Sequence, residues 1–162
     1  MYFDGVIRYI RETVSTQNKA IDYAALAELR YQIRRFLRFS EEASRAAGLE
    51  PQQHQLLLAL KGLPADRMPT VGTLAERLQL QHHSAVELVD RSVQRGLVRR
   101  LRGTADQRQV FIRLTAKGER TLRDLSVHHR DILREAGPGL AEVLSTLAVG
   151  PRRPEKVRKT AS

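Results

Sequence analysis

The sequence predicts a mainly α-helical protein with one small β-hairpin. Three features of the 162-residue chain support this fold class. Long stretches on both sides of the centre carry apolar residues at helical spacing. Residues 70–95 contain two short helical patterns in succession. The spacing then changes to two β-prone runs separated by a charged turn, after which helical spacing resumes.

The chain is expected to begin with two helices. Residues 1–20 alternate apolar and charged side chains at helical spacing, which suggests a short amphipathic helix. A long helix should follow from Asp22, which is suited to an N-cap or a first turn, to about Ala47. Gly48 then ends it, since glycine readily adopts the left-handed conformation beyond a helix C-terminus.

Two shorter helices are expected next. One begins at Pro51, because proline is favoured at the first helical position, and ends at Gly62. The other covers Thr70 to Leu80, with Thr70 and Thr73 as candidate N-caps.

A further helix is expected from about Gln81 to Arg95, where Gly96 stops it. Helical spacing assigns its residues to two faces. The buried stripe comprises Ala85, Val86, Val89 and Val93. The outer face comprises His82, His83, Ser84, Glu87, Asp90, Arg91 and Gln94.

The two β-prone runs are Val98 to Arg102 and Gln109 to Leu114, and residues 103–107 form the turn between them. Residues Val110, Ile112 and Leu114 share one face of the second run. The order helix, helix, hairpin is that of a winged helix-turn-helix. In that fold the second helix enters the DNA major groove and the hairpin lies beside it.

The rest of the chain is predicted to be helical until it reaches a charged tail. Thr115 can cap a long helix to about Ala136, which the Gly-Pro-Gly of residues 137–139 should close. Residues 140–149 make a short final helix. Residues 150–162 combine proline and charge without apolar periodicity, as disordered segments do.

The central motifs resemble those of the MarR family of bacterial transcriptional regulators. They are LAERLQL (74–80), LVDRSVQRGLVRR (88–100), Asp106-Gln107-Arg108, and the LTAKG junction at 114–118. Four short motifs in this order over about fifty residues form a specific match. The resemblance implies a DNA-binding regulator with a two-fold dimer interface made by the terminal helices.

The apolar faces of the first and last helices exceed what a small lobe can cover, which also points to a second subunit. A monomer whose long helices fold back on the lobe is the alternative. The expected division is 1–47 for N-terminal dimerisation helices, 48–118 for the winged lobe, 119–149 for C-terminal dimerisation helices, and 150–162 for the tail. The candidate dimerisation residues are Leu26, Leu29, Ile33, Leu122, Leu125, Ile132 and Leu133.

The formal net charge of +10 argues for an anionic partner, with nucleic acid first. Residues 98–114 hold five arginines and one aspartate, a net charge of +4, and residues 150–162 hold another +4. Residues 70–97 are neutral. Such a concentration of positive charge in the hairpin and tail is typical of segments that contact phosphates. On a generally solvated surface the positive charge would be spread over the chain.

The predicted partner is double-stranded DNA, bound by a homodimer at a nearly palindromic operator. Base contacts are assigned to the N-terminal half of the second central helix, and phosphate contacts to arginines on that helix and in the hairpin. The base-reading candidates are His82, His83, Ser84 and Glu87, and the phosphate-contacting candidates are Arg91, Arg99, Arg100 and Arg102.

The triplet from Asp106 to Arg108 has two interpretations. In isolation it is a turn in which Asp106 caps a backbone N–H and Arg108 is solvated. The MarR resemblance implies instead that Arg108 enters the minor groove while Asp106 braces it. A guanidinium suits a narrow, electronegative groove, which favours the second interpretation.

The resemblance also implies a small phenolic or aromatic ligand in a crevice between the dimer helices and the winged lobe, whose binding releases DNA. The candidate lining residues are Phe36, Phe39, Gln53 and His54. Core packing is the alternative role for the two phenylalanines.

Other function classes have less support. The chain has no cysteine, which excludes disulfides and thiolate zinc sites, and it lacks nucleophile-elbow, P-loop and HExxH motifs. We therefore expect neither an enzyme nor a cofactor. No stretch is long and apolar enough for a membrane span and no signal peptide is visible, so a cytoplasmic protein is predicted.

Two alternatives to a sequence-specific regulator stay open. One is a winged-helix module that contacts nucleic acid or protein without sequence specificity. The other is a metal-responsive regulator that uses histidines. Its candidate residues are His128 and His129, with Asp124 and Asp131 three or four residues away.

Overall fold

The computed structural model describes residues 22–103 and 109–149. The helix predicted over 1–20, most of the hairpin turn and the basic tail therefore lie outside the described residues. The elements in chain order are α2 (Tyr23–Ala46), α3 (Pro51–Lys61), α4 (Val71–Leu78), α5 (His82–Gln94), β1 (Val98–Arg102), β2 (Val110–Leu114) and α6 (Ala116–Val149).

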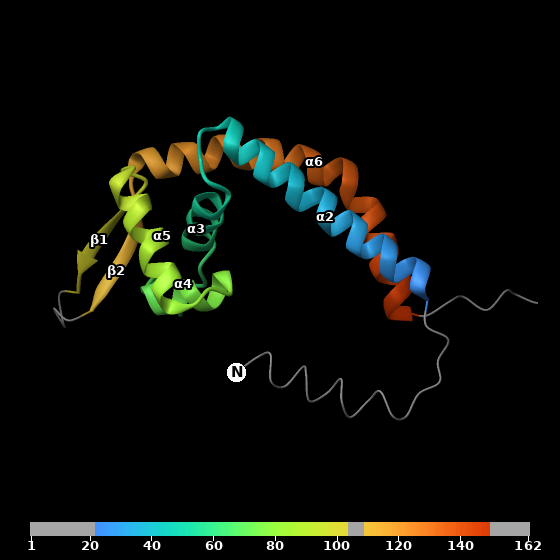
Figure 1. Cartoon of the computed structure of the whole chain (residues 1–162), viewed down its shortest axis with the longest axis horizontal. Coiled ribbons are helices and arrows are strands. Elements are labelled where there is room, and N and C mark those ends of the chain that lie inside the picture. The colour runs from blue at the N-terminus through green and yellow to red at the C-terminus, as the bar shows by residue number, and fades with distance from the viewer. Residues whose placement is uncertain (1–21, 104–108, 150–162) are drawn as a thin grey trace, which may run out of the picture.

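The molecule has two parts (Figure 1). Helices α3, α4 and α5 and the β1–β2 hairpin form a winged lobe at one end. Helices α2 and α6 run side by side away from that lobe as a long helical arm. The prediction of a mainly helical protein with one hairpin is confirmed.

Predicted capping residues define several helix ends. The Asp22 carboxylate accepts a 2.9 Å hydrogen bond from the Ala25 N–H at the start of α2. The Thr70 hydroxyl accepts from the Thr73 N–H at the start of α4, so Thr70 is the cap rather than Thr73. Glycines with positive φ follow two helices, Gly48 at +72° after α2 and Gly96 at +67° after α5.

Helix α4 ends two residues earlier than predicted. Gln79 adopts the left-handed conformation with φ of 54°, which stops the helix after Leu78. The Leu80 N–H then donates to the Ala75 carbonyl at 2.9 Å. Glutamine is an unusual residue at this position, and its identity alone did not indicate the stop.

The buried face of α5 differs from the predicted stripe. Ala85 and Val89 are buried as expected, but Val93 is 36% exposed. Leu88 and Ser92 are buried instead. Ser92 can be buried because its hydroxyl donates to the Leu88 carbonyl at 2.7 Å, which satisfies the polar group within the helix.

The hairpin is antiparallel, with Val98 opposite Leu114 and Arg102 opposite Val110. Its inner face packs on the lobe, where Ile112 is fully buried. The Ile112 N–H also donates to the Pro69 carbonyl at 2.8 Å, which ties β2 to the segment before α4.

Helix α6 begins in close contact with the hairpin. The Thr115 hydroxyl accepts a 3.0 Å hydrogen bond from the Gly118 N–H, which confirms Thr115 as the cap. A Cβ added to Gly118 would lie 2.1 Å from the Leu97 carbonyl oxygen. Only glycine therefore allows this crossing, which gives the glycine of the LTAKG junction a steric role.

The core lies inside the winged lobe and extends onto α6. Leu122 and Leu125 are only 5% and 4% exposed and belong to this core. Their predicted role at a subunit interface is therefore wrong, because their surface is already covered within one chain. Core residues are Leu49, Leu56, Leu57, Leu74, Leu88, Val89, Leu97, Val98, Ile112, Leu122 and Leu125.

Helix α6 continues for 34 residues through Pro138, so the predicted break at residues 137–139 is wrong. Pro138 lacks the N–H that would bond to the Arg134 carbonyl, and this costs one helical hydrogen bond. Packing of α6 along α2 supplies tertiary contacts over this part of the chain, and such contacts routinely override local propensity. In the described ranges, no helix is sufficiently long and apolar to cross a membrane.

Candidate nucleic-acid interface

The N-terminal half of α5 presents the predicted base-reading residues at the surface. His82, His83 and Glu87 are exposed and Ser84 is half-buried. Gln81 precedes the helix without a side-chain capping bond, so its side chain does not occupy the first N–H groups of α5. This end of the helix therefore offers imidazole, hydroxyl, carboxylate and backbone groups that can form hydrogen bonds.

Arg91 has a partner inside the lobe. Its Nε lies 3.4 Å from Glu50 Oε2, and this Nε is buried without a hydrogen-bond partner among the described residues. The sequence placed Arg91 on the outer face as a phosphate contact. In the structure it is half-buried and links α5 to the start of α3.

Arg95 makes a second link of this kind, which the sequence analysis missed. Its Nη1 donates to Gln53 Oε1 at 2.9 Å, and its Nη2 donates to the Gly48 carbonyl. Lys117 Nζ donates to the Arg95 carbonyl at 2.8 Å. These bonds join the C-terminus of α5 to the α2–α3 junction and to α6. The feature of the sequence that could have indicated these bonds is a basic residue at the end of a helix, where such side chains often bond backbone carbonyls.

The hairpin carries the predicted arginines on both faces. Arg100 Nη1 bonds Asp90 Oδ1, which fixes β1 against α5. Arg99 and Arg102 are exposed. Arg113, which the sequence analysis counted only as charge, is exposed directly opposite Arg99. Period-two alternation along β2 is the signal that would have placed it there.

Asp106 and Arg108, at the tip of the wing, lie outside the described residues. Their predicted roles stay predictions.

A second cluster of predicted residues lies where the lobe meets the arm. The ring centroids of His54 and His129 are 4.7 Å apart, and the His129 ring is 6.3 Å from Phe36 and 5.7 Å from Phe39 in edge-on contacts. His129 Nε2 lies 2.8 Å from Ser40 Oγ. The cluster thus connects α2, α3 and α6.

A groove of about 410 Å³ opens beside this cluster. Phe36, His54, Leu58, His129 and Leu133 are among its lining residues. Gln53 and Phe39, which the sequence grouped with Phe36 and His54, are not among them. Gln53 is bonded to Arg95, and Phe39 lines a neighbouring cavity of about 90 Å³.

Burial lowers the pKa of His54 to about 4, and the adjacent His129 adds to the shift. The imidazole is therefore neutral at pH 7. Its Nδ1 is buried without a hydrogen-bond partner among the described residues.

The histidines proposed as metal ligands on α6 do not converge. His128 Nδ1 lies 3.0 Å from the Asp124 carbonyl, whereas His129 is directed toward Ser40. Within the described ranges, no three His, Cys, Asp or Glu side chains gather closely enough to hold a metal ion.

Sequence comparison finds relatives for the central part of the chain. Residues 47–109 match the sequence model of the MarR family. The uncharacterized HTH-type transcriptional regulator YsmB of Bacillus subtilis (strain 168) is 32% identical over 66 residues. This match covers 41% of the present chain and 45% of YsmB, so it spans less than half the length of that relative.

Solved structures match over a larger share of the chain. AbsC, a MarR family transcriptional regulator from Streptomyces coelicolor, has a TM-score of 0.65 at 23% identity, covering 83% of this chain and 92% of its own. A MarR family protein from Bacillus stearothermophilus has a TM-score of 0.62 at 27% identity, with coverages of 80% and 97%. A mutant of S. aureus MepR, bound to an oligodeoxyribonucleotide, has a TM-score of 0.59 at 17% identity, with coverages of 78% and 99%.

The matched residues include α3, α4, α5 and β1, the elements that carry the interface described above. The likeness in fold extends over the helical arm as well. The central part of the chain thus matches the MarR family model, and the fold is similar to that of solved MarR family transcriptional regulators.

Proposed function

We propose that the protein regulates transcription by binding double-stranded DNA through α5 and the hairpin. One observation carries the proposal: the exposed N-terminal face of α5 lies beside an arginine-bearing hairpin, and the Arg100–Asp90 ion pair holds the two together. A helix and wing fixed in this way suit simultaneous contact with a major groove and the adjacent backbone. The DNA-bound MepR structure, which has the same fold, supports this mode.

We infer that the functional species is a homodimer formed by the helical arms. The support is apolar surface on α2 and α6 that the single chain leaves uncovered. Leu26 is 41% exposed and Ile33 42% exposed, while Leu133 on α6 is 45% exposed. A two-fold dimer would present two α5 helices to successive major grooves, about 10 base pairs apart, and would select a nearly palindromic operator.

Selection from a random pool of double-stranded DNA tests the proposal. Enrichment of a near-palindromic consensus is expected with the full chain, and sedimentation at micromolar concentration should give a dimer. Enrichment of no sequence, together with binding of equal strength to unrelated duplexes, would favour a module that contacts DNA only through its charge. A monomer in sedimentation would overturn the proposed dimer.

We further propose that the protein represses its target genes and that a small aromatic ligand in the groove beside His54 releases DNA. The groove joins the lobe to the arm, so a ligand there can favour one relative placement of the two parts. Repeating the selected-operator titration with salicylate as a phenolic probe tests the release. Operator affinity that is unchanged at saturating salicylate, as established by direct titration, would contradict it for phenols.

A further inference from the structure

A cavity larger than the groove beside His54 lies at the hairpin. It has a volume of about 670 Å³ and lies on the outer side of the hairpin. Its walls come from the segment before α4, residues of β1 and β2, the end of α3 and the first turn of α6. We call it the outer wing groove. Its volume is in the range of sites that hold small molecules.

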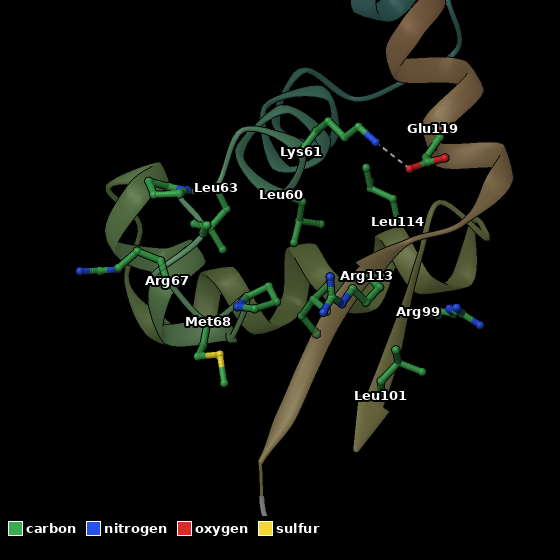
Figure 2. A pocket seen from close by; sticks show the side chains of 14 residues that line it. Leu60, Lys61, Leu63, Arg67, Met68, Arg99, Leu101, Arg113, Leu114 and Glu119 are labelled. Atoms are coloured by element: carbon green, nitrogen blue, oxygen red, sulfur yellow. Dashed lines mark hydrogen bonds and ion pairs between the residues drawn. The ribbon is translucent and has the colours of Figure 1, made fainter. Parts of the chain in front are cut away.

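The outer wing groove has a cationic centre. Arg113 stands in the middle of the groove, and Arg67 and Arg99 lie at opposite edges (Figure 2). Arg99 and Arg113 are directly opposite one another in the hairpin register. Like charges at such positions repel, which destabilises a strand pair unless an anion neutralises them.

The other charged groups of the groove are already paired. Lys61 Nζ bonds Glu119 Oε1 at 2.9 Å, and Arg67 bonds Glu76. Neither Arg99 nor Arg113 has a carboxylate partner within ion-pair distance in the described part of the chain. The uncompensated positive charge is therefore on the two hairpin arginines.

Apolar side chains are interspersed with the charged and polar groups of this lining. Leu60, Leu63 and Leu114 lie on the side of the groove nearest α3, while Met68 and Leu101 lie at its lower rim in Figure 2. Met68 is 58% exposed and Leu101 36% exposed. Apolar side chains beside a concave cationic centre suit a ligand with an apolar body, whereas DNA phosphates need only the charge and a surface open to a broad cylinder.

We propose that the outer wing groove binds a small amphipathic anion, with one carboxylate at Arg113 and Arg99 and an apolar chain against Leu63, Met68 and Leu101. A guanidinium can hold a carboxylate through two parallel hydrogen bonds. Burial of Met68 and Leu101 beneath the chain supplies hydrophobic stabilisation.

The site has a regulatory consequence that rests on the proposed function. The ligand neutralises two arginines of the wing and contacts both strands and the segment before α4. It thereby removes charge that favours DNA association, so ligand and DNA bind with negative coupling.

Calorimetric titration of the full chain with decanoate tests the site. The test variant is Arg99→Gln/Arg113→Gln, and the matched control is Arg34→Gln/Arg120→Gln, which removes the same charge from exposed positions on α2 and α6. Decanoate should bind the native chain and the control with equal affinity and the test variant at least tenfold more weakly. Decylammonium, which has the same chain and the opposite charge, should not bind the groove.

Several results would overturn the proposal: no heat of binding with decanoate, equal weakening in both double variants, or decylammonium binding as strong as decanoate binding. Thermal melting monitors folding, and the test variant should melt at the native temperature or above, because it lacks a repulsive pair. The titration contains no DNA, so its outcome is independent of whether the protein binds an operator. Operator titration with and without decanoate then measures the coupling separately.

Discussion

The side-chain oxygen of Gln53 accepts a 2.9 Å hydrogen bond from the guanidinium of Arg95, 42 residues further along the chain. Gln53 is fully buried, and its Nε2 has no hydrogen-bond partner in the described part of the chain. Its oxygen also accepts from the Glu50 N–H at 3.3 Å. The bond to Arg95 therefore satisfies a buried polar group and anchors α5 to the beginning of α3.

Replacing Arg95 should destabilise the lobe. Arg95→Ala removes the donor to Gln53 and the donor to the Gly48 carbonyl, so the free energy of unfolding should fall by about 1–3 kcal/mol. Urea denaturation measures the change. Arg120→Ala, an exposed arginine on α6, serves as the control and should change stability by less than about 0.5 kcal/mol. Equal stability of the two variants would show that the Arg95 bonds contribute nothing measurable.

Two glycines of α6 should respond in opposite directions to the same substitution. Gly118→Ala places a Cβ 2.1 Å from the Leu97 carbonyl oxygen, so the start of α6 must shift and stability should fall by more than about 2 kcal/mol. Gly137→Ala meets no atom within 4 Å and should stabilise the helix by roughly 0.5–1 kcal/mol. Thermal melting of both variants checks the pair. A Gly118→Ala protein as stable as the native chain would contradict the close approach of α6 to Leu97, the residue before β1.

Lowering the pH should destabilise the folded protein where the lobe meets the arm, because His54 is buried there in its neutral form. Its pKa is lowered to about 4 in the folded state against about 6.5 in the unfolded state, so the unfolded chain binds more protons between these values. The contribution of neutral His54 is fully present above about pH 6.5 and is lost as the pH falls toward 4. It amounts to roughly 3 kcal/mol, because each pKa unit corresponds to about 1.4 kcal/mol.

Chemical denaturation from pH 7.5 to 4.5 measures this dependence. His54→Gln should make the curve shallower, whereas His83→Gln, at an exposed position on α5, should leave its slope unchanged. Equal slopes for the native chain and His54→Gln would mean that His54 titrates normally.

Arg108→Ala should lower operator affinity at least tenfold and leave the folded dimer intact. The reason is the loss of a guanidinium from the narrow minor groove, where it is strongly attracted. Fluorescence anisotropy with the selected operator measures affinity. Arg120→Ala removes the same charge from α6 and controls for the general electrostatic term, so equal losses in the two variants would exclude a specific role for Arg108.

Local chemistry made many features of this fold predictable. Asp22, Thr70 and Thr115 act as caps, and Gly48 and Gly96 follow helix ends, because short-range hydrogen bonds and backbone conformation determine these positions.

Features that depend on distant contacts were not predictable from the pattern. The sequence analysis assigned Leu122 and Leu125 to an apolar dimerisation face, yet they fill the lobe core, because α6 passes close to Leu97 at Gly118. Local propensity likewise favoured a break at Pro138, and packing against α2 was not visible in the sequence.

In the candidate site, too, some residues could be placed from the sequence and others could not. Helical periodicity placed His82, His83 and Glu87 at the surface of α5. It could not reveal that Arg91 pairs with Glu50 or that Arg95 reaches Gln53, because those partners come from a helix about forty residues earlier in the chain.

Because α6 is one continuous helix, it connects the winged lobe directly to the far end of the arm. Its first turns are fixed in the lobe by Leu122 and Leu125, and the same helix continues to Val149. At a rise of 1.5 Å per residue its 34 residues span about 50 Å. The first residue of α6 lies thirteen residues, or about 20 Å, from His129, so a bend of about five degrees at His129 displaces that end by roughly 2 Å. In a dimer joined through the arms, such a bend around His129 would change the distance between the two α5 helices and so their match to successive turns of a DNA duplex.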